Sequence, residues 1–316
     1  MLAYTLRRLA QAVALVLVVA TLVAVFIHLI PGDPVYVILG ENNVTPERVA
    51  AVRAELGLDR PIPVQYADWL GRVARGDFGD SLTSRRPIGG DLLLRLPRTL
   101  ELILVSTLLS VAVGIPLGVV AATYRNRLPD LFVSTVALVG VSAPVFVVGT
   151  LLLLVFGVRW GILPATGYVA FGEDPLGHLQ HLILPSVTLA TLETAVVLRM
   201  TRSSMLEVLA EDYVRTARAK GLDGQVILYG HALRNALIPV LTIIGVQIGS
   251  SLGGTVLVEL IFNWPGLSSY LVTGINQRDY PVVQAVVLVI AALFILLNLL
   301  TDLIYAVVDP RIRYGA

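Results

Sequence analysis

Glu173, Asp174, His178 and His181 form the densest group of candidate metal ligands in the sequence. Two imidazoles three residues apart, beside carboxylates, are ligands of the kind that a divalent metal such as zinc takes in proteins. The alternative is that these residues are polar groups at a membrane interface. Because nothing in the sequence indicates the outer partners that orient metal-bound histidines, we favour the interfacial alternative.

The sequence offers few other residues that could form a catalytic site. Residues 140–142, GVS, match only the first three positions of a serine nucleophile elbow, and no histidine lies mid-span to act as its base. The chain has no HExxH, no GxGxxG at a strand–helix junction and no GxxxxGK[ST]. It also has no cysteine, which excludes disulfides, thiolate metal sites and cysteine nucleophiles. We therefore expect no catalytic, metal or cofactor site, and an energy source outside this chain.

Composition indicates a membrane protein. Of the 316 residues 56% are hydrophobic and only 14% charged, which is too little charge to cover the surface of a soluble fold of this size. The net charge is +1, so no basic excess is available to neutralise a phosphate backbone. We expect membrane lipid around the chain and no nucleic acid as a partner.

Six apolar segments are long enough to cross a hydrocarbon core about 30 Å thick as helices. They are 9–29, 102–123, 131–157, 182–198, 238–258 and 282–301. The first could instead be a cleaved signal peptide, but its apolar run is too long and no small-residue cleavage site follows. The sequence thus predicts an all-α, polytopic membrane helix bundle with six transmembrane helices.

Basic residues predict the orientation of these helices. With the N-terminus inside, the inner segments hold twelve Lys and Arg residues, and the short outer loops hold only Arg159 and Arg278. We expect both termini in the cytoplasm. This divides the chain into the N-terminus and first helix (1–30), an extracytoplasmic cap region of about seventy residues (31–101), a five-helix core (102–306) with an inner loop at 199–236, and a cytoplasmic tail (307–316). In the cap region we expect a helix with Thr45 as N-cap, Pro46 at its first position and Gly57 at its end.

Glycines within the spans indicate close helix packing. Gly245, Gly249 and Gly253 recur every four residues and would leave a groove along one face of the fifth span. Gly114 and Gly118, with glycines and prolines of the third span, favour either kinked helices that line a moving pathway or ordinary bundle packing.

Glu193 is the only charge well inside an expected span. An acidic residue at a helix centre costs on the order of 2.5–3.5 kcal/mol to insert, so it must face protein or water. Two uses are open: a place in the wall of a pathway through the protein, where the carboxylate would favour a cationic group, or a structural hydrogen bond to Thr or Asn on a neighbouring span. Thr188, Thr191 and Thr194 nearby favour the structural use.

The inner loop carries an amphipathic pattern. From Met205 the apolar residues fall at helical spacing, and Gly221 after Lys220 is placed to end that helix in a left-handed conformation. A second short helix runs toward His231. Such a pair suits either docking into a groove of a soluble partner or a simple interfacial position.

Two segments of this loop carry a family pattern: 211–221, EDYVRTARAKG, and 231–239, HALRNALIP. They closely resemble the cytoplasmic coupling loop of ABC importer permeases of the dipeptide, oligopeptide and nickel group. The general importer motif is EAA, three residues, glycine, nine residues and IxLP. Counted from Gly221, the EAA positions hold Arg215, Thr216 and Ala217, and the IxLP positions hold 231–234. The glutamate and the proline are therefore missing, as in the peptide subgroup, and no contact that needs that glutamate is carried over.

Other segments along the chain are similar to the first permease subunit of that group. They are 29–34 (LIPGDP), 57–61 (GLDRP), 76–79 (GDFG), 262–267 (FNWPGL) and 309–313 (DPRIR).

The resemblance implies a bacterial inner-membrane importer. It implies a second homologous permease, two cytoplasmic ABC ATPases that bind ATP and Mg, and an extracytoplasmic substrate-binding protein. It also implies that the inner loop couples to the ATPases through a defined set of residues. These are Glu207, Glu211, Asp212, Arg215, Thr216, Ala217, Arg218, Lys220, Gly221, His231 and Arg234.

Two other classes compete with this interpretation. An intramembrane hydrolase lacks a base, and an ion-driven carrier would need ionisable groups mid-membrane, where the chain offers only Glu193 and, near a helix end, Asp302. The cargo is left open among a dipeptide, a longer peptide, a nickel complex, glutathione and an oligosaccharide, because specificity is encoded in the binding protein.

Overall fold

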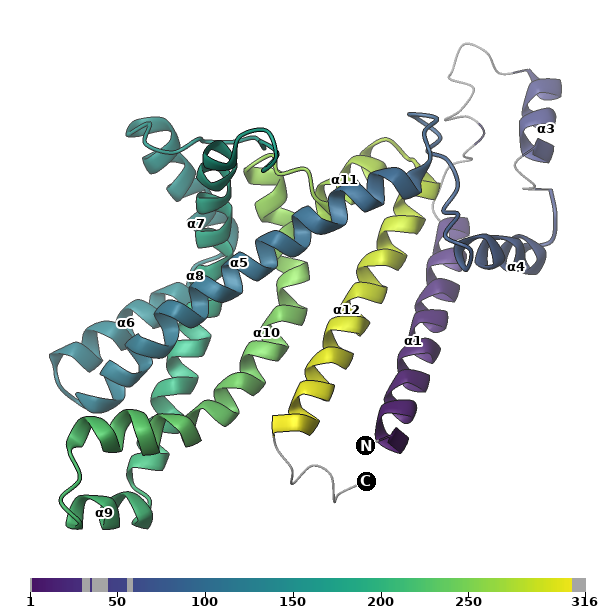
Figure 1. Ribbon diagram of the computed structural model, residues 1–316. Coiled ribbons are helices and arrows are strands. Elements are labelled where there is room, and N and C mark those ends of the chain that lie inside the picture. Colours follow the sequence, from purple (N-terminus) through teal and green to yellow (C-terminus); the bar gives the residue numbers. More distant parts are fainter. Residues whose placement is uncertain (1, 30–34, 36–44, 56–58, 309–316) are drawn as a thin grey trace. The chain divides into compact units, whose positions relative to one another are not determined.

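The computed structural model describes residues 2–29, 35, 45–55 and 59–308 (Figure 1). In these ranges the regular elements are helices, and the one β-type pairing is an isolated bridge between Asp80 and Pro87. The helices are α1 (Leu2–Leu29), α3 (Pro46–Glu55), α4 (Ile62–Val73), α5 (Ile88–Thr123), α6 (Leu128–Ser142), α7 (Val145–Leu152), η2 (Leu153–Arg159), α8 (Pro175–Leu209), α9 (Asp212–Ala219), η3 (Val226–Leu233), α10 (Arg234–Ile261), α11 (Leu267–Asn276) and α12 (Tyr280–Val308). The expectation of an all-α chain is confirmed.

Membrane-spanning length is reached by five of these helical stretches within the described residues. They are Thr5–Val25, Ile88–Thr123, Pro175–Leu209, Val226–Ile261 and Tyr280–Thr301. The third expected span is a broken helix: Leu128–Ser142 and Val145–Arg159 meet at a bend of 105°. Counted as one span, the bent pair brings the number to six.

The bend has a local cause at Ala143 and Pro144. Ala143 is extended, and Pro144, which cannot continue the hydrogen-bond ladder, stands directly before α7. The sequence pattern predicted one continuous segment there, because hydropathy records that residues are apolar and not the direction that a helix takes.

Among the helices that extend beyond their apolar segments, α5 and α8 do so most. α5 begins at Ile88 rather than 102, and α8 runs from Pro175 to Leu209 rather than 182–198. Asp174 caps α8 by accepting hydrogen bonds from the backbone N–H groups of Leu176 (3.1 Å) and Gly177 (3.0 Å). At 1.5 Å per residue α8 is about 52 Å long, well beyond the hydrocarbon thickness.

The described chain forms two compact units. One consists of Leu100–Trp264 with the end of α12 from Leu297 on, and the other of Leu2–Thr99 and Pro265–Leu296. In the first unit α8 packs against α6, α7 and α10. Its largest apolar cluster lies around Leu102, Leu182, Val258 and Trp264, all less than 5% exposed.

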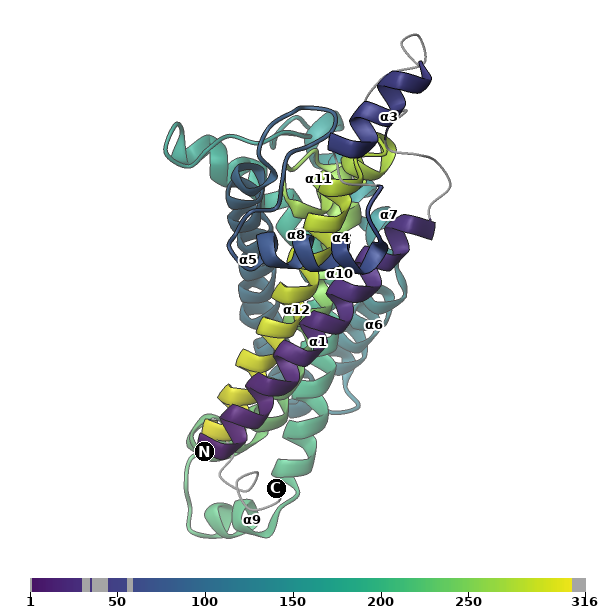
Figure 2. The ribbon, with the colours of Figure 1, turned by 90° about the vertical axis from the view of Figure 1, so that its right-hand side faces the viewer.

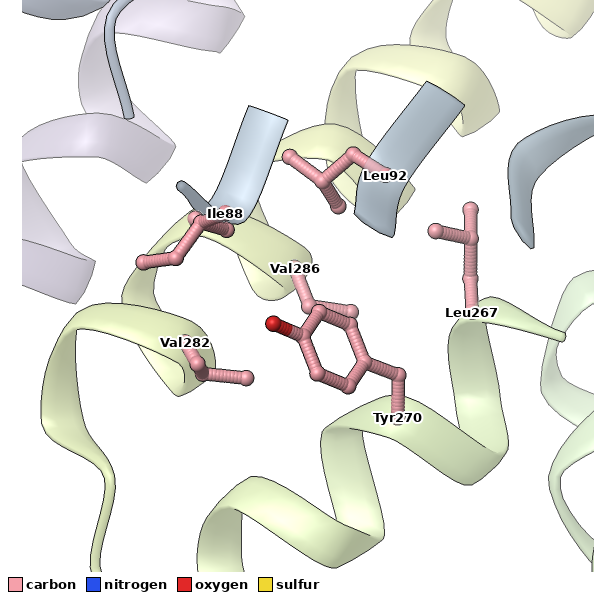
Figure 3. Packing of buried hydrophobic residues seen from close by; sticks show 7 residues of the cluster. Ile88, Leu92, Leu267, Tyr270, Val282 and Val286 are labelled. Carbon is pink, nitrogen blue, oxygen red and sulfur yellow. The ribbon is translucent and has the colours of Figure 1, made fainter. Parts of the chain in front are cut away.

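The second unit has its own apolar cluster, which Figure 3 shows. Ile88 and Leu92 of α5 meet α11 and α12 there, at Leu267, Tyr270, Val282 and Val286. Burial, together with the neighbouring Asp91, raises the pKa of Tyr270 to about 12. The phenol is therefore protonated at neutral pH and donates to Asp91 Oδ2 at 3.3 Å.

In the same unit, hydrogen bonds to the side chain of Asp279 join the loop at 81–83 to the start of α12. Its carboxylate accepts hydrogen bonds from Ser81 Oγ (2.5 Å) and from the backbone N–H groups of Leu82 and Thr83 (both 3.2 Å). The expected helix after Thr45 is also present: Arg48 N donates to Thr45 Oγ1 at 3.3 Å, and α3 begins at Pro46. Gly57, the expected end, lies outside the described residues.

Candidate functional site

The segment between α8 and α10 is built of two short helical elements, α9 and η3. In Figures 1 and 2 α9 lies beyond the same end of α8 in both views. The sequence predicted one helix from Met205 to Lys220, and this is wrong. α8 continues to Leu209, the chain turns at Ala210 and Glu211, and α9 begins at Asp212. The turn lets the apolar face of α9 fold back onto η3, which a straight continuation of α8 would not do.

A small apolar cluster holds α9 in place. Val214 and Ala217 of α9 pack with Ile227 of η3, and Leu209 at the end of α8 covers them. A hydrogen bond from Asn235 Nδ2 to Tyr213 Oη (2.9 Å) adds a link to the start of α10. The loop is therefore supported on one side by buried contacts.

Gly221 ends α9 as the sequence predicted. Its φ is +78°, its N–H donates to Arg218 O (3.0 Å), and Leu222 N donates to Ala217 O (3.3 Å). These two bonds form a Schellman motif, in which a left-handed residue satisfies the last carbonyls of the helix. A side chain at Gly221 would meet no atom within 4 Å, so backbone conformation and not space requires glycine here.

The opposite side of the loop is exposed. All the expected coupling residues face solvent except Ala217, which lies in the buried cluster. The exposed set is Glu207, Glu211, Asp212, Arg215, Thr216, Arg218, Lys220, Gly221, His231 and Arg234. Arg215 and Asp212 form an exposed ion pair, which contributes little to stability.

Sequence reasoning missed exposed apolar groups on this surface. Tyr213, Leu222, Val226 and Tyr229 are each more than 40% exposed. Tyr213 falls at the helical spacing of the apolar residues that begin at Met205, yet it faces solvent. The exposed surface therefore combines charged groups with aromatic and aliphatic groups. This composition is typical of a surface that binds another protein.

Glu193 is buried between three helices of the first unit and is 4% exposed. Its Oε1 lies 2.5 Å from Ser251 Oγ of α10 and 3.3 Å from Ser106 Oγ of α5. Thr188 and Thr191 do not supply this hydrogen bond, because both donate to carbonyls of their own helix. The partners are thus serines more than fifty residues away, which spacing on one helix cannot identify.

An ion pair between a buried carboxylate and a partly exposed arginine also escaped sequence reasoning. Asp130 in the first turn of α6 is 2% exposed, and Arg202 of α8 donates to both of its oxygens, at 2.6 and 2.7 Å. Arg202 had been counted only as a marker of the inner side.

The glycines of α10 divide into two groups. Gly245 and Gly249 are buried, whereas Gly253 is exposed and a Cβ there would meet no atom within 4 Å. Helix packing at Gly253 stays a prediction.

The four candidate metal ligands are separated. His178 is buried, with Nδ1 2.7 Å from Val169 O and Nε2 2.8 Å from Glu101 Oε1, while Asp174 caps α8. His181 Nδ1 lies 2.7 Å from Gly177 O. Within the described residues no three such groups converge. His178 is therefore buried among aromatic rings, and its level in the membrane stays a prediction.

Comparisons with known proteins agree with this architecture. The family model described as binding-protein-dependent transport system inner membrane component matches residues 114–314, and the model of the N-terminal part of such components matches residues 1–103. The chain is 44% identical to the dipeptide transport system permease protein DppB of Escherichia coli K12, with 99% of each chain covered. It is 45% identical to the glutathione transport system permease protein GsiC of Salmonella typhimurium, covering 99% of this chain and 100% of the relative.

Solved structures show the same fold at low identity. An inward-facing form of the MetNI methionine ABC transporter matches 69% of this chain and 96% of the solved chain, with a TM-score of 0.56 and 18% identity. An amino acid ABC transporter with histidines matches 69% and 94%, with a TM-score of 0.51 and 15% identity. The relatives are transport subunits and not enzymes, which agrees with the lack of catalytic motifs. The chain therefore belongs to the family of binding-protein-dependent transport system inner membrane components, and within it to the dipeptide and oligopeptide group of ABC importer permeases.

Proposed function

We propose that this permease forms half of the pathway by which short peptides, or solutes of similar size, enter the cell, and that a second homologous permease forms the other half. The relatives matched over nearly their whole length carry names that refer to dipeptides, di- and tripeptides and glutathione, all of which contain amino acid residues linked by amide bonds. ABC importers of this family work with ATPases and a binding protein.

The exposed surface of α9 and η3 is the proposed docking site for a cytoplasmic ATPase. The observation that carries this proposal is the division of the loop into a buried side, with Val214 and Ala217, and an exposed side that holds most of its charge. A loop supported in this way can pass on a rigid displacement. Its contacts must differ between the two states of the ATPases, since equal docking to both would shift nothing. ATP and Mg are bound by those subunits.

The proposed orientation puts both termini and the coupling loop in the cytoplasm. Residues 31–101 and the cargo-delivering protein then lie outside. Support comes from the excess of basic residues in the inner segments over the short outer loops.

Reconstitution tests the transport function. The two permeases and two ATPases in proteoliposomes, supplied with the binding protein and ATP, should accumulate labelled dipeptide, and removal of the ATPases should abolish uptake. Uptake driven by an ion gradient without ATP would contradict the proposal.

Cross-linking tests the docking surface separately. Because the chain has no cysteine, single cysteines can be placed at Arg218 and, as a matched control, at exposed Phe171 just before the other end of α8. The cysteine at Arg218 should cross-link to cysteines on the ATPase surface, and the one at Phe171 should not. A cross-link from the cysteine at Phe171, and none from the cysteine at Arg218, would contradict the proposed docking surface.

A further inference from the structure

The ion pair between Asp130 and Arg202 is fixed by more than charge. Arg202 Nε donates to Oδ1 at 2.6 Å and its Nη2 to Oδ2 at 2.7 Å, so the guanidinium binds both oxygens. Asn126 N (2.8 Å) and Ser134 Oγ (3.1 Å) donate to the same carboxylate. This paired geometry holds the two helices in one register, since a slide of either would leave a buried carboxylate uncompensated.

Close packing of α5 against α8 occurs at the same level. A Cβ built on Gly118 would lie 2.6 Å from Thr201 Cβ and 2.8 Å from Leu198 O. Thr201 directly precedes Arg202, so both α5 and α6 are held to one short stretch of α8.

That stretch leads directly to the coupling loop. From Arg202 to Leu209 α8 advances about 10 Å. Met205 is fully buried on the way, and Leu209 covers the cluster of Val214 and Ile227 that holds α9. Figure 1 shows the turn between α5 and α6 and helix α9 near the same end of α8. A continuous set of packed groups therefore joins Asp130 to α9.

We infer that Asp130 and Arg202 are positioning residues for energy coupling, which make the turn between α5 and α6 move as one body with the coupling loop. This inference rests on the proposed docking of that loop to the ATPases. A displacement of α9 then reaches α6 through α8.

Spin labelling of the complete complex tests this movement with the ion pair intact. Cysteines replace Arg125 in the α5–α6 turn and Ala219 on α9, both exposed. Electron paramagnetic resonance measures the distance between the two spin labels. This distance should be the same in the nucleotide-free and the ATP-bound complex. A change of several ångströms would overturn the inference, whatever any ion-pair variant does.

Variants test whether the pair matters for coupling. In proteoliposomes, Asp130→Asn and Arg202→Gln should each reduce the cargo transported per ATP hydrolysed at least tenfold, and the double variant should be no worse than either one. Ser134→Ala is the matched control, because it removes one donor to Asp130 and leaves the ion pair, and it should keep the ratio within twofold.

If both single variants transport as much cargo per ATP hydrolysed as the unmodified complex, the inference is overturned. ATP-driven uptake by the unmodified complex supports the proposed function in that case too. Absence of ATP-driven uptake by the unmodified complex contradicts the proposed function itself. If the variants do not assemble, the label separation in the unmodified ion-pair background decides.

Discussion

Glu193 is held by two serine hydroxyls, each of which also lies within hydrogen-bond distance of a carbonyl of its own helix. Glu193→Gln keeps the shape and an acceptor oxygen, so we expect uptake of cationic and neutral cargo to change less than twofold, at equal protein level. Glu193→Ala should lower the melting temperature of the purified complex, because a cavity and lost bonds cost about 1–3 kcal/mol. A selective loss of cationic cargo in Glu193→Gln would instead place the carboxyl in the wall of the pathway.

Gly221 occupies a conformation that costs a residue with a side chain roughly 1–2 kcal/mol. Gly221→Val should therefore misplace the end of α9 and reduce ATP-driven uptake, while Val214 and Ala217 keep the loop folded. Uptake and ATP hydrolysis of the reconstituted complex measure the effect. Gly224, whose φ is not in the left-handed region, is the control: Gly224→Val should leave both activities near the wild-type level.

At the scale of elements, α5 and α8 approach closely at Gly118. Gly118→Ala forces a methyl group against Thr201 and the carbonyl of Leu198, and such overpacking typically costs 1–3 kcal/mol. We expect a clear fall in the thermal stability of the purified chain. Gly253→Ala is the matched control, since the same methyl group meets open space there and alanine favours a helix by about 1 kcal/mol. Equal melting temperatures of the two variants would contradict this packing.

The existence of the membrane-spanning helices could be predicted from the sequence, whereas their ends and pairings could not. Apolar runs identified all six segments, because twenty apolar residues have few alternatives to a spanning helix. Hydropathy could not reveal that α8 continues to Leu209. A helix can continue through polar residues outside the membrane, and hydropathy records only where the residues are apolar. It also could not separate α9 from α8, because a turn of two residues leaves the apolar spacing nearly unchanged.

The same limit applies to the site. Gly221 was predictable because its role depends on the residues next to it in the chain. The pairs Asp130 with Arg202 and Glu193 with Ser251 join residues 72 and 58 positions apart, and no local pattern specifies such pairs. The family resemblance identified the loop, and the structure then showed that Ala217 faces inward while Tyr229 faces outward.

At the scale of the whole molecule, the orientation is open to a direct test. Single cysteines at Ser84 and at Asp223, both exposed, should react with a membrane-impermeant maleimide from opposite sides. Ser84 should label in intact cells, and Asp223 only after the inner membrane is opened. Labelling in the reverse order would invert the topology and put the coupling loop outside.

We expect the bend between α6 and α7 to form only after α8 has been synthesised. Neither helix has a side-chain cap at the break, and Gly140 and Gly149 on its two sides pack against Thr191 and Thr188 of α8. Unsatisfied backbone groups are costly in lipid. While the ribosome has not yet delivered α8, the nascent third span therefore has no support for its bent form. A photoreactive amino acid in place of Ala137, which packs with Ala195 and Leu198 in the finished fold, should cross-link to lipid in chains arrested before α8 and to α8 itself once α8 has entered the membrane.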